Sequence, residues 1–460
     1  MIDRWDRWPL SAMVVTGLCA GLYANGFDSA LGQSLACLLS SIALCLALAA
    51  IKPGADFWAM ARWPLLLFAV ALLWLLIVDA VRWTLPLSEI ELPIAPDLFL
   101  AKFLSIVAGL WALLTGALFG WKRPPALSAP VCLVVLLTAH ILLGLVLLLG
   151  ILPGNGLWAG WTVMKDGRFT GLVGNANVTA AMCAAGAVLS LAFAMSLWNS
   201  RRAKGWRRQD GLVMIGLLAA GLLHLIALVM TASRFPVMMT LIAFLLLALA
   251  QKNAAKADAW RFWPPAVAVF LAVIVSHVLF SDLLLTRAGN LVGEAYARGE
   301  YWRHFFDMAA NAPLTGYGPS AFPTANLYFL QSATDAVGTS TINSPHSIVL
   351  QLWFVGGAPY LLLMLAGAGL IGRDILFRRG LWRWDVRDIG VLLASLAIMA
   401  CGLVDIVLDY PVGTQIAFFL LGFAWMGGGE RGAVAAGTDP IAPVIRETLL
   451  RHRSPRGGAP

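Results

Sequence analysis

The sequence predicts an all-α polytopic membrane protein with about twelve transmembrane helices, and three observations support that prediction. Of the 460 residues, 60% are hydrophobic and only 12% are charged, whereas soluble domains are about 45–50% apolar and about 25% charged. The mean hydropathy is +0.81. Apolar runs of roughly 17–25 residues, each long enough to cross a bilayer about 30 Å thick, recur from one end of the chain to the other.

The apolar runs divide the chain into expected spans and loops. The opening segment MIDRWDRWPL mixes acidic and basic residues and lacks a clean small-residue cleavage site, so we expect an uncleaved first span. The spans are expected at 10–27, 30–50, 64–81, 98–119, 130–152, 174–197, 211–231, 235–251, 264–281, 347–371, 389–408 and 413–428. The predicted domains are 1–281 with nine spans and short loops, a large helical loop at 282–346, three spans in 347–428, and a disordered basic cytoplasmic tail at 429–460.

The distribution of lysine and arginine predicts the side of the membrane that each loop faces. A cytoplasmic N-terminus puts 24 of the 32 basic residues in inside segments, in agreement with the positive-inside rule, and places both termini in the cytoplasm. Because topology explains most of the net charge of +8, that charge does not indicate nucleic-acid binding. Eight basic residues remain on the outside: Arg82, Lys102, Lys165, Arg168, Arg234, Arg287, Arg298 and Arg303.

Arginines on the disfavoured outer side indicate an anionic partner, because guanidinium groups match phosphate oxygens well. Arg234, in TASRFP, lies where two apolar runs meet with almost no loop. An arginine at that depth is costly unless it faces a cavity or an anion, although a snorkelling helix-end residue is an equally good interpretation. Arg168 precedes the stretch GNAN, where free amides at a helix start would attract an anion, but an ordinary loop would look similar.

A histidine opens the span that follows the large loop, in the stretch NSPHSIVLQLW. Pro345 suits the first turn of a helix, and Ser344 or Asn343 can cap it. His346 would then lie in the first turn, where the helix dipole disfavours the imidazolium form. A neutral imidazole is a candidate general base. The alternative is a polar residue at the membrane interface.

The large outer loop contains a predicted helix at 294–311 whose aromatic residues suit the membrane surface. After it, PLTGYGP contains Gly316 and Gly318, which we expect to let the backbone approach a ligand closely. No Asp-x-Asp occurs in an outer loop, so a divalent cation has no obvious site. We therefore expect neither a metal nor another cofactor, and arginines would supply the positive charge instead.

Taken in order, these stretches resemble the O-antigen ligase and polymerase superfamily. The resemblance rests on TASR at the end of a span, Arg298-x3-Trp302 followed by PLTGYGPSAF, and NSPHSIVLQLWFVGG. GRFTGLVGNAN and LDYPVG are similar to two further elements of the family, and the resemblance runs from about residue 165 to 415.

The resemblance implies a GT-C-like, inverting, metal-independent glycosyltransferase in the bacterial inner membrane, with its active site on the periplasmic side. Its donor would be O-antigen glycan on undecaprenyl diphosphate, and its acceptor a sugar hydroxyl of lipid A–core among the membrane lipids. His346 would activate the acceptor hydroxyl. The diphosphate would be held by Arg168, Arg234, Arg298 and Arg303, with support from Tyr317, Asn343 and Asp409.

Twelve spans with one dominant outer loop between spans nine and ten favour the ligase within this superfamily. The alternatives are an O-antigen polymerase, which tends to have two large outer loops, and a protein O-oligosaccharyltransferase, which usually has a folded outer domain after the last span. A lipid-linked glycan transporter or flippase is the alternative from another class. It would need polar residues at mid-membrane on several helices, and the spans here are nearly free of mid-membrane charge.

Overall fold

The computed structural model describes residues 8–84, 96–122, 129–151, 163–254, 291–330, 342–378, 381 and 384–427. The expected ninth span at 264–281 and the tail at 429–460 lie outside these residues. Arg287 also lies outside them, and the side chain of Arg298 is not among those that the structure describes.

The described part of the chain confirms the prediction of an all-α, multi-pass membrane protein. It contains eight helices that are long and apolar enough to cross a membrane, together with three shorter apolar helices. In chain order these helices are α1 (Trp8–Cys19), α2 (Ala30–Ile51), α3 (Ala55–Thr84), α4 (Pro96–Lys122), α5 (Ala129–Leu148), α6 (Ala176–Lys204), α7 (Arg208–Met230), α8 (Arg234–Ala254), α14 (Ile348–Arg373), α15 (Val386–Val404) and α16 (Pro411–Gly427).

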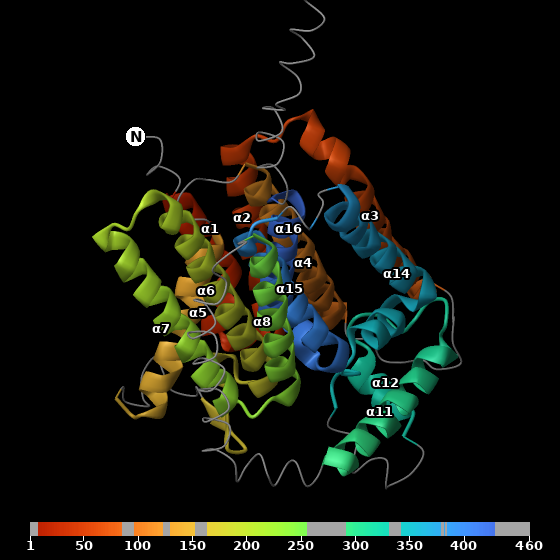
Figure 1. Cartoon of the computed structure of the whole chain (residues 1–460). Coiled ribbons are helices and arrows are strands. Elements are labelled where there is room, and N and C mark those ends of the chain that lie inside the picture. Colours follow the sequence, from red (N-terminus) through yellow and green to blue (C-terminus); the bar gives the residue numbers. More distant parts are fainter. Residues whose placement is uncertain are drawn as a thin grey trace, which may run out of the picture.

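Small residues let the central helices pack closely. α16 lies along α4, α15 lies along α6 and α16, and α14 lies along α3 (Figure 1). A Cβ atom added at Gly116 of α4 would lie 2.0 Å from the carbonyl oxygen of Phe419, and one added at Gly422 would lie 2.0 Å from that of Leu113. Such glycines allow two helix backbones to approach within a membrane, where van der Waals packing drives association.

The first expected span is shorter than 10–27, because the helix ends at Cys19. Two 3₁₀ turns follow it, η2 (Ala20–Tyr23) and η3 (Asn25–Phe27). Asn25 and Gly26 have φ values of 49° and 68°, a left-handed conformation that breaks a helix. A Cβ atom at Gly26 would lie 2.4 Å from the ring of Tyr410, so this turn packs directly against the start of α16.

The helix predicted at 294–311 is confirmed as α11 (Leu291–Asn311), and the short helix α12 (Phe322–Tyr328) follows it. Both lie beyond one end of the α3–α14 pair in Figure 1. They share a small apolar core in which Phe305 and Phe322 pack against Phe354 of α14.

Gly316 and Gly318 bring the loop after α11 close to another part of the protein backbone, the broken turn of α14. α14 is broken at Gly357, which has φ +72°. The broken turn is bridged by the loop after α11: the amides of Tyr317 and Gly318 donate to Phe354 and Val355, at 2.6 and 2.9 Å. A Cβ atom at Gly316 would lie 2.4 Å from the Phe354 carbonyl oxygen. The glycines therefore let the loop satisfy carbonyl groups that the break leaves unpaired.

Candidate functional site

Four segments that are distant in sequence meet at one end of the helix bundle. They are residues 163–177, 231–234, 342–348 and 405–411, and we call this region the site end. It contains the first residues of α6 and α8 and the last of α15, toward the bottom of Figure 1.

His346 lies before α14 and not in its first turn, which corrects the expected position. The helix begins at Ile348, and its N-cap residue is Ser347, without a side-chain capping bond. Neither Asn343 nor Ser344 caps the helix as expected, because the helix begins at Ile348, three residues after Pro345. His346 has φ +53°, a conformation that is uncommon for residues other than glycine and in which strained residues cluster at active sites and ligand-binding segments.

The His346 ring faces Asp405, the residue that ends α15. Its Nδ1 atom lies 3.7 Å from Oδ1 of Asp405, within ion-pair range, and the two side chains are 39% and 10% exposed. Oδ1 of Asp405 also accepts from the Ile406 amide at 2.8 Å, and Oδ2 accepts from the Asn177 side-chain amide at 2.6 Å. With Nδ1 turned toward a carboxylate, Nε2 is the ring nitrogen left to face another group.

The hydrogen bonds of Asp405 keep it ionised. Burial alone would raise the pKa of this carboxyl group, but the adjacent His346 ring and the bonds from Ile406 and Asn177 together hold the pKa below its ordinary value. The site end thus holds a fixed negative charge beside the histidine.

Asn177 connects Asp405 to Arg168. Nη2 of Arg168 donates to Oδ1 of Asn177 at 2.6 Å and to the Ser233 hydroxyl at 2.6 Å. The Arg168 Nε atom donates to the Thr231 carbonyl oxygen at 2.8 Å. The Ser233 hydroxyl in turn donates to Asn177 at 2.7 Å. These contacts join α6, the start of α8 and the end of α15 into one polar network.

The chain before α6 explains how Arg168 reaches this network. Strands β1 (Met164–Lys165) and β2 (Arg168–Phe169) form an antiparallel hairpin, with Asp166 and Gly167 at positive φ in its turn. The amides at the start of α6, which we expected to be free for an anion, are instead occupied. The Asn175 side chain caps the helix by accepting from Asn177 and Val178.

Asp409 has a separate partner. It accepts a hydrogen bond from the hydroxyl of Ser344, two residues before His346. Burial raises the pKa of Asp409 above its ordinary value, although Lys102 and the Ser344 hydroxyl act in the opposite direction. Asp405 and Asp409 therefore approach the 342–348 segment at two different points.

The other predicted residues have varied surroundings. Arg234 is the first residue of α8, directly after Ser233, and is partly buried. Arg303 is exposed on α11, and Asn343 is exposed before α14. Tyr317 is 4% exposed and stacks on Phe354 with ring centroids 4.9 Å apart.

Our reading of the sequence missed Asp405 and Asn177. Both carried a weak signal: Asp405 ends an apolar run four residues before Asp409, and Asn177 is the second asparagine of GNAN. Among the residues that the structure describes, no group of three or more His, Cys, Asp or Glu side chains could hold a metal ion.

The comparisons with known proteins point to one family. The profile described as O-antigen ligase matches residues 219–365, a segment that contains Arg234, the loop with Gly316 and Gly318, and His346. No curated protein matches the chain. The matched segment covers the central motifs in their expected order and supports membership of the O-antigen ligase superfamily.

Proposed function

We propose that this protein transfers O-antigen glycan from undecaprenyl diphosphate to a sugar hydroxyl of lipid A–core. Members of its superfamily are glycosyltransferase-like enzymes, either ligases or polymerases. We place the reaction in the periplasmic leaflet of a bacterial inner membrane, with both termini in the cytoplasm. We propose that transfer inverts the anomeric carbon and needs no metal ion.

The pairing of His346 with Asp405 is the observation that carries the proposal. A base that removes a proton from a sugar hydroxyl becomes positively charged, and an adjacent carboxylate stabilises that charge. Asp405 lies 3.7 Å from Nδ1 of His346, and its own pKa is lowered. Hydrogen bonds from the side chain of Asn177 and from the amide of Ile406 hold this carboxylate in place.

The proposed reaction is a single displacement. Nε2 of His346 takes the proton of the acceptor hydroxyl while the acceptor oxygen forms a bond to the anomeric carbon. The bond between that carbon and the diphosphate oxygen breaks, and its electron pair leaves with undecaprenyl diphosphate. The negative charge that develops on the leaving group needs positive charge close to it.

We assign that positive charge to four arginines. Two of them lie in or beside the polar network, and two are carried by α11. Arg234 adjoins Ser233, which contacts both Arg168 and Asn177. Arg168 holds the network together through its guanidinium group, and we propose that the positive charge of this group acts on the diphosphate. Arg298 and Arg303 are carried by α11, so we propose that they contact the diphosphate from the outer loop.

The test uses purified full-length protein, lipid-linked O-antigen and lipid A–core in the presence of EDTA. A gel mobility shift of the acceptor reports ligation by the wild type, His346→Ala and Arg234→Ala. We expect product from the wild type alone. Longer glycan on the lipid carrier, without modified lipid A–core, would identify a polymerase. Product from His346→Ala at nearly the wild-type rate would exclude His346 as the base, and a transporter would also keep its flux in this variant.

A further inference from the structure

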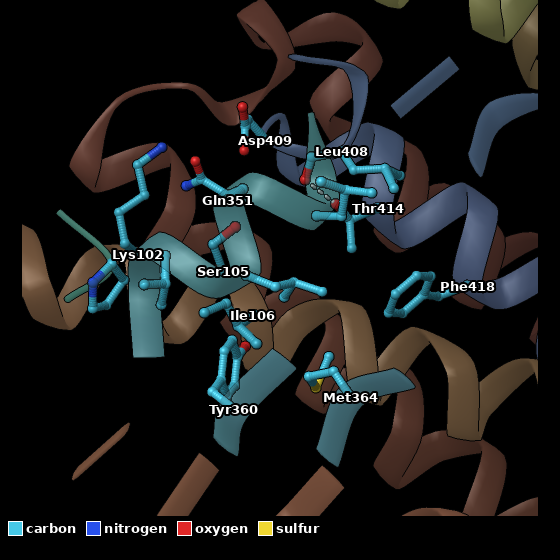
Figure 2. Close-up of a pocket in the computed structure, with 14 residues that line it drawn as sticks. Lys102, Ser105, Ile106, Gln351, Tyr360, Met364, Leu408, Asp409, Thr414 and Phe418 are labelled. Atoms are coloured by element: carbon cyan, nitrogen blue, oxygen red, sulfur yellow. Dashed lines mark hydrogen bonds between the residues drawn. The ribbon is translucent and has the colours of Figure 1, made fainter. Parts of the chain in front are cut away.

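A cavity of about 90 Å³ lies between α4, α14 and α16, beside the site end (Figure 2). Its lining separates into two parts. Lys102, Gln351 and Asp409 lie at one end, with Leu408 and Thr414 close by, whereas the other end is apolar. The apolar end includes Ile106, Met364 and Phe418. Such a lining suits a molecule with a polar head and an apolar continuation.

Two buried polar atoms of this lining have no hydrogen-bond partner among the described residues. They are the hydroxyl of Tyr360 and Oε1 of Gln351. Tyr360 is 0% exposed, and its hydroxyl points toward the cavity in Figure 2. An unpaired polar atom buried at membrane depth is costly, because no lipid group can pair with it. These atoms therefore indicate a ligand with hydrogen-bonding groups.

The chemistry of these groups indicates hydroxyls and not phosphate. Oε1 of Gln351 only accepts hydrogen bonds, whereas the Tyr360 hydroxyl can donate or accept. A sugar hydroxyl can pair with both, whereas the oxygens of an ionised phosphate ester only accept and cannot pair with Oε1 of Gln351. Lys102 at the same end can donate to ring or hydroxyl oxygens. A sugar ring offers donors and acceptors together.

The cavity and the arginine network are connected to the His346 segment through different residues. Gln351 belongs to the first turn of α14, which His346 precedes, and Asp409 is bonded to Ser344. Arg168 is reached from His346 through Asp405 and Asn177. An inverting displacement has the nucleophile and the leaving group on opposite faces of the anomeric carbon, and separate binding regions for acceptor and diphosphate suit that requirement.

We propose that the cavity between α4, α14 and α16 binds a sugar of the glycolipid acceptor, with Tyr360 and Gln351 as its hydrogen-bonding partners. The inference rests on the proposed function, since it names the acceptor of that reaction. The hydroxyl end of the sugar faces His346, and the apolar part of the acceptor continues toward Met364 and Phe418.

The experiment measures binding without catalysis. Full-length protein in nanodiscs is titrated with lipid A–core glycolipid in the absence of donor, and separately with undecaprenyl diphosphate. Tyr360→Phe and Gln351→Met should each weaken glycolipid binding about fivefold, the effect of one hydrogen bond. Undecaprenyl diphosphate binding should stay the same.

Tyr328→Phe is the matched control, because it removes the same atom from a side chain that is 59% exposed. Thermal melting of each variant shows that it is folded. Unchanged glycolipid binding in both cavity variants would overturn the inference, and so would weaker binding of undecaprenyl diphosphate instead, which would assign the cavity to the donor chain. A wild type that binds glycolipid but transfers nothing would contradict only the proposed function.

Discussion

At the end of the bundle where α6 meets α7 and α14 meets α15, the ion pairs of the described residues join side chains nearby in sequence, whereas at the site end polar side chains bond to distant ones. Nε of Arg201 lies 3.0 Å from Oδ1 of Asp210, and Nη2 of Arg387 lies 3.3 Å from Oδ1 of Asp388. At the site end, Asn177 and Asp405 are 228 residues apart, and Ser344 and Asp409 are 65 apart.

The contacts at the two ends of the bundle have different roles. Asp210 and the Arg207 amide form part of a capping box at the start of α7, so the local pairs stabilise helix ends. The distant pairs form only when the whole bundle is assembled. They give His346 and Asp405 a defined geometry, as a catalytic site requires.

Asp405→Asn should give the largest effect. We expect the transfer rate to fall on the order of 100-fold, because the asparagine cannot stabilise a protonated His346. The measurement is single-turnover glycan transfer. His346→Ala should be at least as severe, and the double variant should be no worse than His346→Ala, because the two residues act as a unit. If the fold-losses of the two single variants multiply in the double variant, His346 and Asp405 act independently.

The stability of the same variant should depend on pH. The pKa of Asp405 is lowered in the folded protein, so its ionised form contributes stability above its unfolded pKa of about 3.9. That contribution is lost as the pH falls through the folded pKa. The difference in melting temperature between wild type and Asp405→Asn should therefore be full near pH 7 and shrink below about pH 4. A difference that grows in acid would contradict this sign.

Gly357→Ala should destabilise the protein by about 2–3 kcal/mol, since φ +72° is strained for alanine. The added Cβ atom would also lie 2.2 Å from the Leu314 backbone. Thermal melting in detergent measures the loss. Gly369→Ala is the control, because a Cβ atom there meets nothing within 4 Å. Equal melting temperatures for the two variants would show that the break in α14 is not needed.

Asn177→Ala should reduce transfer about tenfold, because it removes one charge-assisted hydrogen bond to Asp405 and frees Arg168 from it. The effect should appear in the rate of transfer and little in the melting temperature. An equal loss in Asn199→Ala, on the same helix but far from the site end, would show that the network is not responsible.

Asp210→Asn should have the smallest effect and should leave transfer unchanged. It removes the ion pair with Arg201 and weakens the cap of α7, which costs about 0.5–1 kcal/mol of stability. Melting temperature and transfer rate are measured on the same preparation. A clear loss of transfer in Asp210→Asn would mean that the end of the bundle with the local ion pairs affects the site end, and would contradict the separate roles described for them.

Much of the fold could be predicted, because a long apolar run in a membrane forms a helix, which pairs the backbone N–H and C=O groups of the run with one another. The expected bounds of α2, α5 and α7 agree with the structure within a few residues, whereas α6 continues to Lys204, beyond the expected end at 197. The errors fall where local rules compete with tertiary contacts. Pro345 favours an early helix start, but Ser344 is bonded to Asp409, and the helix begins at Ile348 instead.

Composition and local order were enough to predict the membrane class, the helices of the described spans and a candidate histidine before α14. Only the tertiary structure decided that Asp405, rather than Asp409, faces His346. Both carboxylates end the same apolar run, and the choice depends on how α6, α15 and the segment before α14 pack. It also decided that Gly316 and Gly318 serve α14, and that Tyr360 and Gln351 line one cavity. Contacts between distant segments depend on packing, which local sequence does not specify.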